Sequence, residues 1–137
     1  YDKKNIILVG TPTWSQDVDT AAKSPVKGYS NIMYTFHFYA ATHGSEYRKK
    51  VQAAIDRGLP VFVSEFGVSE SSGNGHIDKT EADKWISFLR KNKISYVCWS
   101  LSNKAESCSL LKSSSTRTGN FKTSDLSTAG KWYKTVK

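Results

Sequence analysis

The sequence predicts an α/β fold in which one sheet is built from parallel strands. Two observations predict it. Short apolar runs begin near residues 6, 32, 61 and 95, and the segments between them change from a period of two to a helical period of 3.6. Strands that alternate with helices form right-handed parallel crossovers, so the expected order is βαβαβαβα.

The third apolar run carries the most informative residue of the chain. It spans residues 61–67 and places an acid, Glu65, at the carboxyl end of a buried strand. Because strand residues alternate between faces, Glu65 is expected on the same face as Val63, and Ser64 and Phe66 on the opposite face. A buried acid at this position is either a helix cap or ion-pair partner, or a group placed for chemistry.

Other strands end in aromatic or ionisable residues as well. The period of two places His37 and Tyr39 on one face near the end of the second strand, and Trp99 ends the fourth. Parallel strands present functional groups at their carboxyl ends, both in open doubly wound sheets and in TIM barrels. We therefore expect these side chains to be neighbours of Glu65.

Two segments between the strands have a clear helical period, residues 46–57 and 78–91. Their apolar residues fall on one face of each helix: Tyr47, Val51, Ala54, Ile55, Ala82, Trp85, Ile86 and Leu89. A capping pattern formed by Thr80 and Asp83 marks the start of the second helix. We also expect a short helical piece over 17–23 and a C-terminal helix over 127–136.

Composition and motifs exclude several classes of ligand. The 137 residues suit a single domain, 1–137, with 38% hydrophobic and 23% charged residues. The net charge of +8 is dispersed along the chain rather than interleaved with aromatic residues, which argues against nucleic-acid binding. No glycine-rich phosphate loop follows the first strand, and no apolar stretch of 18 or more residues is present, which argues against a nucleotide and a membrane.

Histidines and cysteines do not form a recognisable metal motif. His37, His43 and His76 have neither cysteine partners nor spacing suited to zinc, so no metal site is expected. Cys98 is expected to be a small buried residue within a strand, and Cys108 lies in a loop ten residues later. Their spacing leaves both a disulfide and two free thiols open.

Three motifs in this order resemble the last strands of glycoside hydrolase family five, and most closely its secreted bacterial endo-β-1,4-glucanases. The motifs are 37–39 (His-Phe-Tyr), 61–67 (Val-Phe-Val-Ser-Glu-Phe-Gly) and 99–106 (Trp-Ser-Leu-Ser-Asn-Lys-Ala-Glu). The loops 10–17 and 118–127 resemble the same proteins, so the resemblance covers essentially the whole chain. It implies half of a TIM (β/α) barrel.

The resemblance also implies an activity, which is the hydrolysis of β-1,4-glucan without a cofactor. It makes Glu65 the catalytic nucleophile of a retaining mechanism, with His37 and Tyr39 as its neighbours. The implied substrate contacts along the glucan cleft are Trp14, Trp99, Lys104 and Glu106. Taken singly, each has a simpler role: a tryptophan packs, and an exposed Lys-x-Glu pair contributes about 0–1 kcal/mol.

Half of the expected machinery is absent from the sequence. A TIM barrel needs at least ~200 residues, and the general acid/base of the family lies in an Asn-Glu-Pro motif that this chain lacks. Glu70 is the nearest acid in sequence, and its polar loop indicates a solvated charge. The start at Tyr1, without a methionine, indicates a processed or excised segment, and no signal peptide is present.

Four parallel strands alone leave two sheet edges and one face uncovered, which favours association. We expect a homo-oligomer or a complementing N-terminal half barrel as partner, a β-1,4-glucan or cello-oligosaccharide as substrate, and, by the resemblance, a secreted protein. The alternative function is a catalytically silent half barrel or a weak carbohydrate-binding module. A third interpretation is an unrelated open α/β domain.

Overall fold

The computed structural model describes residues 2–136 and contains four strands, five α-helices and one 3-10 helix within them. The strands are β1 (Ile7–Val9), β2 (Ile32–Tyr39), β3 (Val61–Gly67) and β4 (Tyr96–Cys98). The helices are α1 (Pro12–Ser15), α2 (Val18–Ala21), α3 (Ser45–Asp56), α4 (Lys79–Lys91), η1 (Thr123–Asp125) and α5 (Thr128–Tyr133). The alternating order confirms the α/β class.

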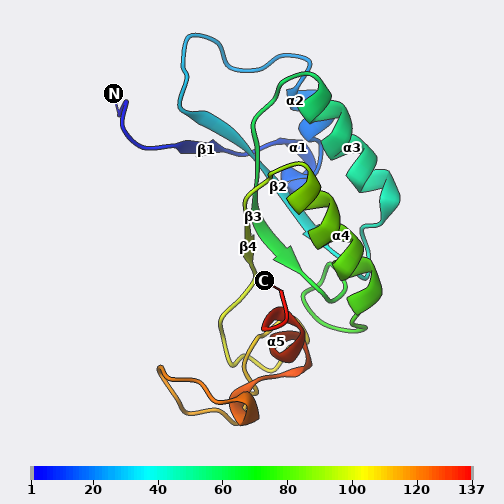
Figure 1. Cartoon of the computed structure of the whole chain (residues 1–137), viewed down its shortest axis with the longest axis vertical. Helices are drawn as coiled ribbons and strands as arrows, with labels where there is room; N and C mark the ends of the chain where they lie inside the picture. Colours follow the sequence, from blue (N-terminus) through cyan, green and yellow to red (C-terminus); the bar gives the residue numbers. More distant parts are fainter. Residues whose placement is uncertain (1, 137) are drawn as a thin grey trace.

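All neighbouring strands are parallel, and their order in the sheet is β1-β2-β3-β4. Helices α2, α3 and α4 lie on one side of this sheet, as Figure 1 shows. The segment after β4 passes below the sheet in the same view before it returns as α5. A hydrogen bond of 2.8 Å from Trp132 Nε1 to Asp83 Oδ1 connects α5 to α4.

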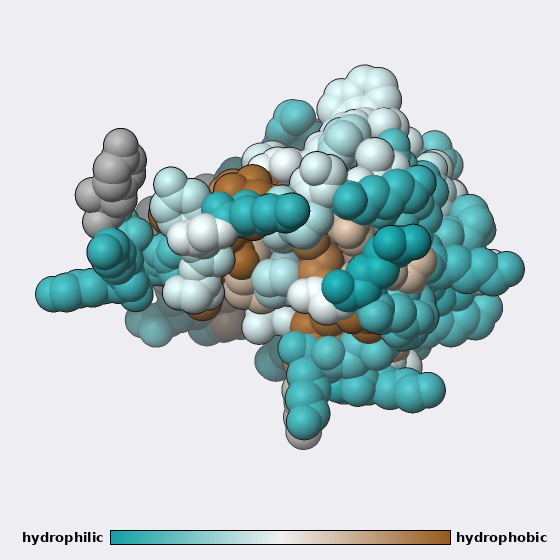
Figure 2. All heavy atoms as spheres, turned by 90° about the horizontal axis from the view of Figure 1, so that it is seen from above, coloured by the Kyte–Doolittle hydropathy of each residue, from teal (hydrophilic) through white to brown (hydrophobic). Residues whose placement is uncertain are grey.

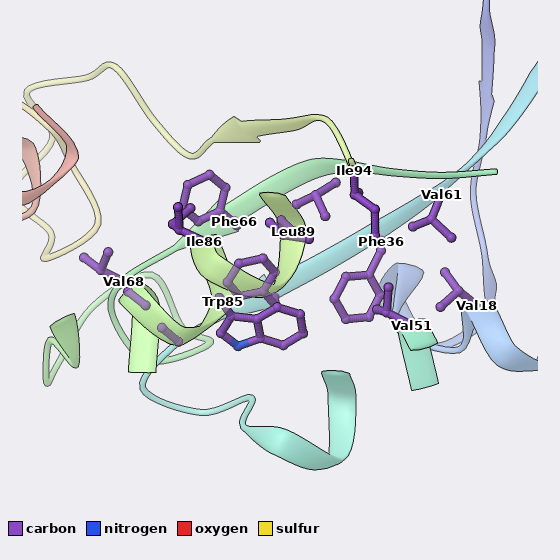
Figure 3. Packing of buried hydrophobic residues seen from close by; sticks show 14 of the residues in the cluster. Val18, Phe36, Val51, Val61, Phe66, Val68, Trp85, Ile86, Leu89 and Ile94 are labelled. Carbon is purple, nitrogen blue, oxygen red and sulfur yellow. The ribbon is translucent and has the colours of Figure 1, made fainter. Parts of the chain in front are cut away.

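The core lies between the sheet and its helices, and it contains a group of packed aromatic rings (Figure 3). Trp85 of α4 is fully buried and packs on Phe36 and Phe38 of β2, with ring centroids 5.6 and 4.0 Å away. Phe38 in turn stacks on Phe66 of β3 at 5.2 Å. Buried rings of this size contribute a large apolar area to the packing of α4 against the strands.

The helices begin and end close to the predicted positions, with corrections at their caps. Helix α4 begins after Asp78, whose side chain accepts a hydrogen bond from the Glu81 amide, so the predicted capping pair of Thr80 and Asp83 was wrong. An aspartate just before a helix satisfies an amide that has no intrahelical partner. The expected helix over 127–136 is also shorter, because α5 covers only Thr128–Tyr133.

The sheet face opposite the helices carries apolar side chains. Exposed residues of β1 and β4 and of the segment after β4 include Leu8, Val97, Trp99 and Leu101, which are 41–65% exposed. Seen from above, hydrophobic residues also come to the surface between the hydrophilic ones (Figure 2). Within residues 2–136, no helix is both long and apolar enough to cross a membrane.

Candidate active site

A bulge in β3 decides which way Glu65 points. Opposite β2, Val63 pairs with Phe36 and Glu65 pairs with His37, so Ser64 is an extra residue without its own partner. The extra residue shifts the alternation by one position. Phe66 therefore joins Val63 in the core, and Glu65 points to the opposite face, where His37 lies. The predicted faces of Glu65 and Phe66 were wrong for this reason.

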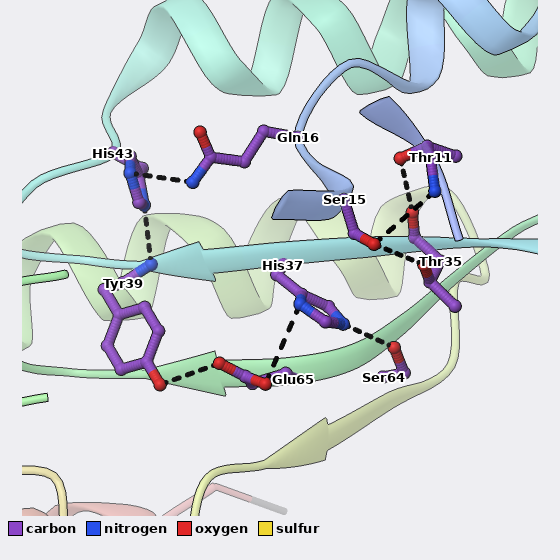
Figure 4. Close-up of polar contacts among 9 residues, drawn as sticks. All are labelled: Thr11, Ser15, Gln16, Thr35, His37, Tyr39, His43, Ser64 and Glu65. Atoms are coloured by element: carbon purple, nitrogen blue, oxygen red, sulfur yellow. Dashed lines mark hydrogen bonds and ion pairs between the residues drawn. The ribbon is translucent and has the colours of Figure 1, made fainter. Parts of the chain in front are cut away.

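The structure brings Glu65 together with the two residues of β2 that the sequence singled out (Figure 4). The Tyr39 hydroxyl donates a hydrogen bond of 2.8 Å to Glu65 Oε1. His37 Nδ1 lies 3.7 Å from the other carboxylate oxygen, and His37 Nε2 lies 2.8 Å from Ser64 Oγ. The carboxylate is therefore held from both sides, and its polar contacts within residues 2–136 include no second carboxylate.

The two neighbours of Glu65 are kept neutral near pH 7. Burial, together with the hydrogen bond and the charge of Glu65, raises the pKa of Tyr39 far above its ordinary value of 10.0. Tyr39 therefore remains a hydrogen-bond donor. Burial also lowers the pKa of His37 below 6.5, although the charge of Glu65 opposes this shift.

Small and buried residues fix the position of Tyr39. Gly67 pairs with Tyr39 across the strands, and a Cβ atom at Gly67 would lie 2.6 Å from two carbons of the tyrosine ring. The backbone amide of Tyr39 donates a hydrogen bond of 2.8 Å to Nδ1 of His43, which is buried. The other ring nitrogen of His43 lies 3.2 Å from the Gln16 side-chain amide.

Trp14 is presented by an unusual turn between β1 and α2. Thr13, Trp14 and Ser15 all have positive φ angles, of 54°, 52° and 61°, so the predicted loop is a left-handed turn within α1. A left-handed conformation is unfavourable for residues with a Cβ atom. Here Ser15 is fixed to β2, because Thr35 Oγ1 and Ser15 Oγ are 2.7 Å apart. The turn leaves Trp14 86% exposed.

A cavity of about 600 Å³ connects these groups. The residues that line it include Trp14, Gln16, His37, Tyr39, His43 and Glu65. Its wall combines an aromatic surface with the carboxylate and several hydrogen-bonding groups, and this combination suits a polar ligand with apolar faces such as a sugar.

Lys104 and Glu106 lie together beside a different hollow of about 470 Å³. Lys104 Nζ is 2.7 Å from Glu106 Oε2, and this ion pair lowers the pKa of Glu106 and raises that of Lys104. Trp99 lines neither cavity, but it stands half exposed after β4 at a cis peptide bond to Ser100. Of the predicted contact residues, Trp14 therefore shares a cavity with Glu65, whereas Lys104 and Glu106 line a different one.

Glu70 is exposed, as predicted, but it also organises its loop. Its Oε1 atom accepts a hydrogen bond of 3.0 Å from the His76 amide. The same loop contacts the loop after β4, because Asn74 Oδ1 accepts hydrogen bonds from the amide and hydroxyl of Ser107 at 3.2 and 3.0 Å. The side chain of Glu70 therefore stabilises its own loop.

Both cysteines are free thiols in the structure, which decides between the two alternatives left open by the sequence. Cys108 is buried, whereas Cys98 is only partly buried. Burial is the largest cause that raises the pKa of Cys98 to about 12 and that of Cys108 to about 11. Such thiols are poor nucleophiles at neutral pH. Within residues 2–136, no three side chains of the metal-binding types are grouped to hold an ion.

Comparison with known proteins identifies the family. Residues 1–105 match the family model of cellulase, described as glycosyl hydrolase family 5. The chain belongs to this family. An endoglucanase of Clostridium saccharobutylicum is 49% identical over 133 residues, which cover 97% of this chain and 30% of that protein. Endoglucanase Z of Dickeya dadantii is 46% identical over 108 residues, which cover 79% of this chain and 25% of that protein.

Solved family 5 structures agree in fold. The cellulase Cel5C_n has a TM-score of 0.88 and 44% identity, over 94% of this chain and 39% of that chain. A variant of the catalytic domain of Thermobifida fusca endoglucanase Cel5A, in complex with cellotetraose, has a TM-score of 0.82 and 34% identity, over 93% and 44%. The four parallel strands and their helices are thus part of a family 5 TIM barrel. The chain spans only 25–33% of the length of the curated endoglucanases and cellulases that it resembles.

Sequence reasoning missed three residues of the site: Ser64, His43 and Gln16. Ser64 was predicted on the face opposite Glu65, because a bulge leaves no mark in the hydrophobic period. His43 was considered only as a metal ligand, although it follows Tyr39 by four residues and its ring accepts the Tyr39 amide. Gln16 follows Trp14 by two residues, and only the left-handed turn brings it to the cavity.

Proposed function

We propose that this chain is half of the catalytic barrel of a retaining endo-β-1,4-glucanase and that Glu65 is its nucleophile. The observation that carries the proposal is the Glu65 carboxylate in its family 5 motif, held by Tyr39 at 2.8 Å and facing the cavity. A retaining glycosidase needs such a carboxylate to attack the anomeric carbon and form a glycosyl-enzyme intermediate. Tyr39 and His37 orient it for the attack.

We propose that aromatic and charged groups hold the sugar. Trp14 and Trp99 present flat faces, which suit the C–H faces of pyranose rings, and both are exposed. Lys104 and Glu106 are placed to hydrogen-bond hydroxyl groups at a separate position along the glucan. We assign these residues to substrate binding rather than to the chemical step.

We propose that the proton donor comes from outside this chain. A retaining mechanism uses two carboxyl groups roughly 5–5.5 Å apart, one for attack and one to protonate the leaving oxygen. Within residues 2–136, Glu65 has polar contacts only with Tyr39 and His37, and Glu70 is bonded to its own loop. These contacts support an acid/base group that is supplied by whatever completes the barrel.

A complementing half barrel, or a second copy of this chain, would complete it. Two four-stranded halves that each contribute half of the strand stagger reproduce an eight-stranded barrel of shear eight. With a two-fold axis along the barrel axis, all strands remain parallel, and the exposed apolar residues Leu8 and Val97 face inward. By its resemblance to secreted endoglucanases, we also propose that the protein acts outside the cell.

The test is light scattering coupled to an activity assay on soluble β-glucan. We predict activity in a particle larger than one chain, and none in Glu65→Gln, which keeps the shape of the side chain but removes the nucleophile. Circular dichroism confirms that the variant remains folded. Activity of Glu65→Gln within tenfold of the parent, at equal purity, would refute the assignment. A strictly monomeric particle at micromolar concentration would refute assembly from two copies.

The alternative function is a carbohydrate-binding half barrel without activity, which is favoured because the polar contacts of Glu65 within residues 2–136 include no second carboxylate. Under both functions, Trp99→Ala should weaken the binding of cello-oligosaccharides more than it lowers the melting temperature, because the indole is 47% exposed and contributes little packing. Titration calorimetry measures the affinity. Unchanged affinity with a lower melting temperature would mean that Trp99 serves packing only.

A further inference from the structure

The β3 bulge places two successive side chains around one imidazole ring. Ser64 Oγ lies 2.8 Å from Nε2 of His37, and Glu65 Oε2 lies 3.7 Å from Nδ1 of the same ring (Figure 4). In a regular strand, consecutive side chains point to opposite faces and one of the two contacts would be lost. The bulge therefore links a hydroxyl, an imidazole and a carboxylate in one line.

The chemistry of the two partners decides which ring nitrogen carries the proton. Because burial keeps the pKa of His37 below 6.5, the ring is neutral at pH 7 and has one N–H group and one lone pair. A carboxylate that acts as a nucleophile is ionised, and an ionised carboxylate only accepts hydrogen bonds. The arrangement without opposed lone pairs has the proton on Nδ1, toward Glu65, and the lone pair on Nε2, toward Ser64.

Ser64 is the closer of the two partners. The distance of 3.7 Å to Glu65 exceeds the usual range of 2.7–3.2 Å for an N–H···O hydrogen bond, so the carboxylate alone holds the ring weakly. The Ser64 hydroxyl has no other hydrogen bond within the described residues, and its proton is thus available to Nε2. A hydroxyl is well suited to this role because it rotates toward the available acceptor.

We propose that Ser64 is a positioning residue, which donates its hydroxyl proton to Nε2 of His37 and so fixes the histidine as the Nδ1–H tautomer with its N–H directed at Glu65. The importance of that N–H for catalysis rests on the proposed function of Glu65. The tautomer itself is a property of the chain and can be measured without any activity.

The test is long-range ¹H–¹⁵N correlation NMR of the histidine side chains at pH 7.5, which distinguishes protonated from unprotonated ring nitrogens. The chain has three histidines, assigned by His37→Gln, His43→Gln and His76→Gln. His43 serves as an internal reference of the opposite kind. Its Nδ1 atom accepts the Tyr39 amide, which requires the Nε2–H tautomer and the oxygen of the Gln16 amide, rather than its nitrogen, toward Nε2. We expect His37 in the Nδ1–H form and His43 in the Nε2–H form within one spectrum.

Two variants test the role of the hydroxyl. Ser64→Ala removes it, and the Nε2–H form of His37 should then become populated, while Ser64→Thr keeps a hydroxyl and should restore the parent spectrum. An unchanged His43 signal shows that the fold is intact in each variant. An Nε2–H tautomer of His37 in the parent chain would overturn the proposal. A His37 tautomer that is the same in Ser64→Ala as in the parent would overturn it equally.

The functional consequence is measured separately, in the active particle. Ser64→Ala should lower kcat about 3–10-fold, the effect of one net hydrogen bond, with KM little changed, and Ser64→Thr should recover most of it. An unchanged kcat in Ser64→Ala, with the tautomer altered, would overturn the catalytic importance of the N–H. Absence of activity in the parent would refute a site completed by two copies of this chain but leave the NMR result interpretable.

Discussion

Glu65 owes its position to contacts that carry no charge of their own. Gly67 leaves room for the ring of Tyr39, and His43 holds the Tyr39 backbone amide at 2.8 Å. The Tyr39 hydroxyl then reaches Glu65. At the scale of single residues, the geometry of the carboxylate therefore depends on a histidine whose own role is to accept a backbone amide.

This role of His43 predicts a pH dependence of stability. Burial is the largest influence on its pKa and lowers it below 6.5; Glu46 of α3 opposes the shift and Lys50 of the same helix adds to it. A histidine whose folded pKa is depressed binds protons more readily in the unfolded chain. The contribution of neutral His43 to the free energy of unfolding is complete above pH 6.5 and is lost as the pH falls from 6.5 toward the pKa of His43 in the folded chain. We predict that the free energy of unfolding decreases over this range.

Urea unfolding between pH 5 and 7.5 measures this effect. His43→Gln should reduce the slope of stability against pH, at some cost in stability at pH 7.5. His37 also has a lowered pKa, so a residual slope remains in His43→Gln. His76→Gln, which changes an exposed histidine, is the matched control and should keep the parent slope. Equal slopes in His43→Gln and the parent would contradict this account.

At the scale of the elements, helices and strands were predictable because their periods extend over many residues. The buried faces of α3 and α4 are those that the sequence indicated, including Val51, Trp85 and Leu89. The β3 bulge was not predictable, because it depends on one residue and on pairing with both neighbouring strands. The left-handed turn at Trp14 was not predictable either, because a tertiary contact of Ser15 with Thr35 stabilises it.

The N-terminal cap of α4 gives a prediction at this scale. Asp78 accepts the Glu81 amide at 2.9 Å, and Asp78→Ala leaves this amide unsatisfied. We expect a loss of about 1 kcal/mol in the free energy of unfolding, the usual cost of removing such a cap. Chemical denaturation measures it, with Lys79→Ala at the neighbouring exposed position as control. A change of less than about 0.3 kcal/mol in Asp78→Ala would show that the cap is dispensable.

At the scale of the whole molecule, the sheet has helices on one side and exposed apolar side chains on the other. Solved relatives contain more than twice the length that this chain covers, at 39% and 44% coverage. The family and the half-barrel fold could be predicted because three motifs occur in a fixed order. The roles of Glu65, Trp14, Trp99, Lys104 and Glu106 stay predictions, since they depend on a substrate and on the completed barrel.

The most direct test of the central claim separates the nucleophile from the missing acid. The probe is a 2-deoxy-2-fluoro-cellobioside with a dinitrophenyl leaving group. This group departs without protonation, so attack on the sugar needs only the nucleophilic carboxylate. Incubation with this chain, followed by mass spectrometry of the intact protein and of its peptides, reports the covalent adduct. We predict one added glycosyl unit, located on Glu65 and absent from Glu65→Gln. Labelling at another residue, or equal labelling of Glu65→Gln, would contradict the assignment of Glu65 as the nucleophile.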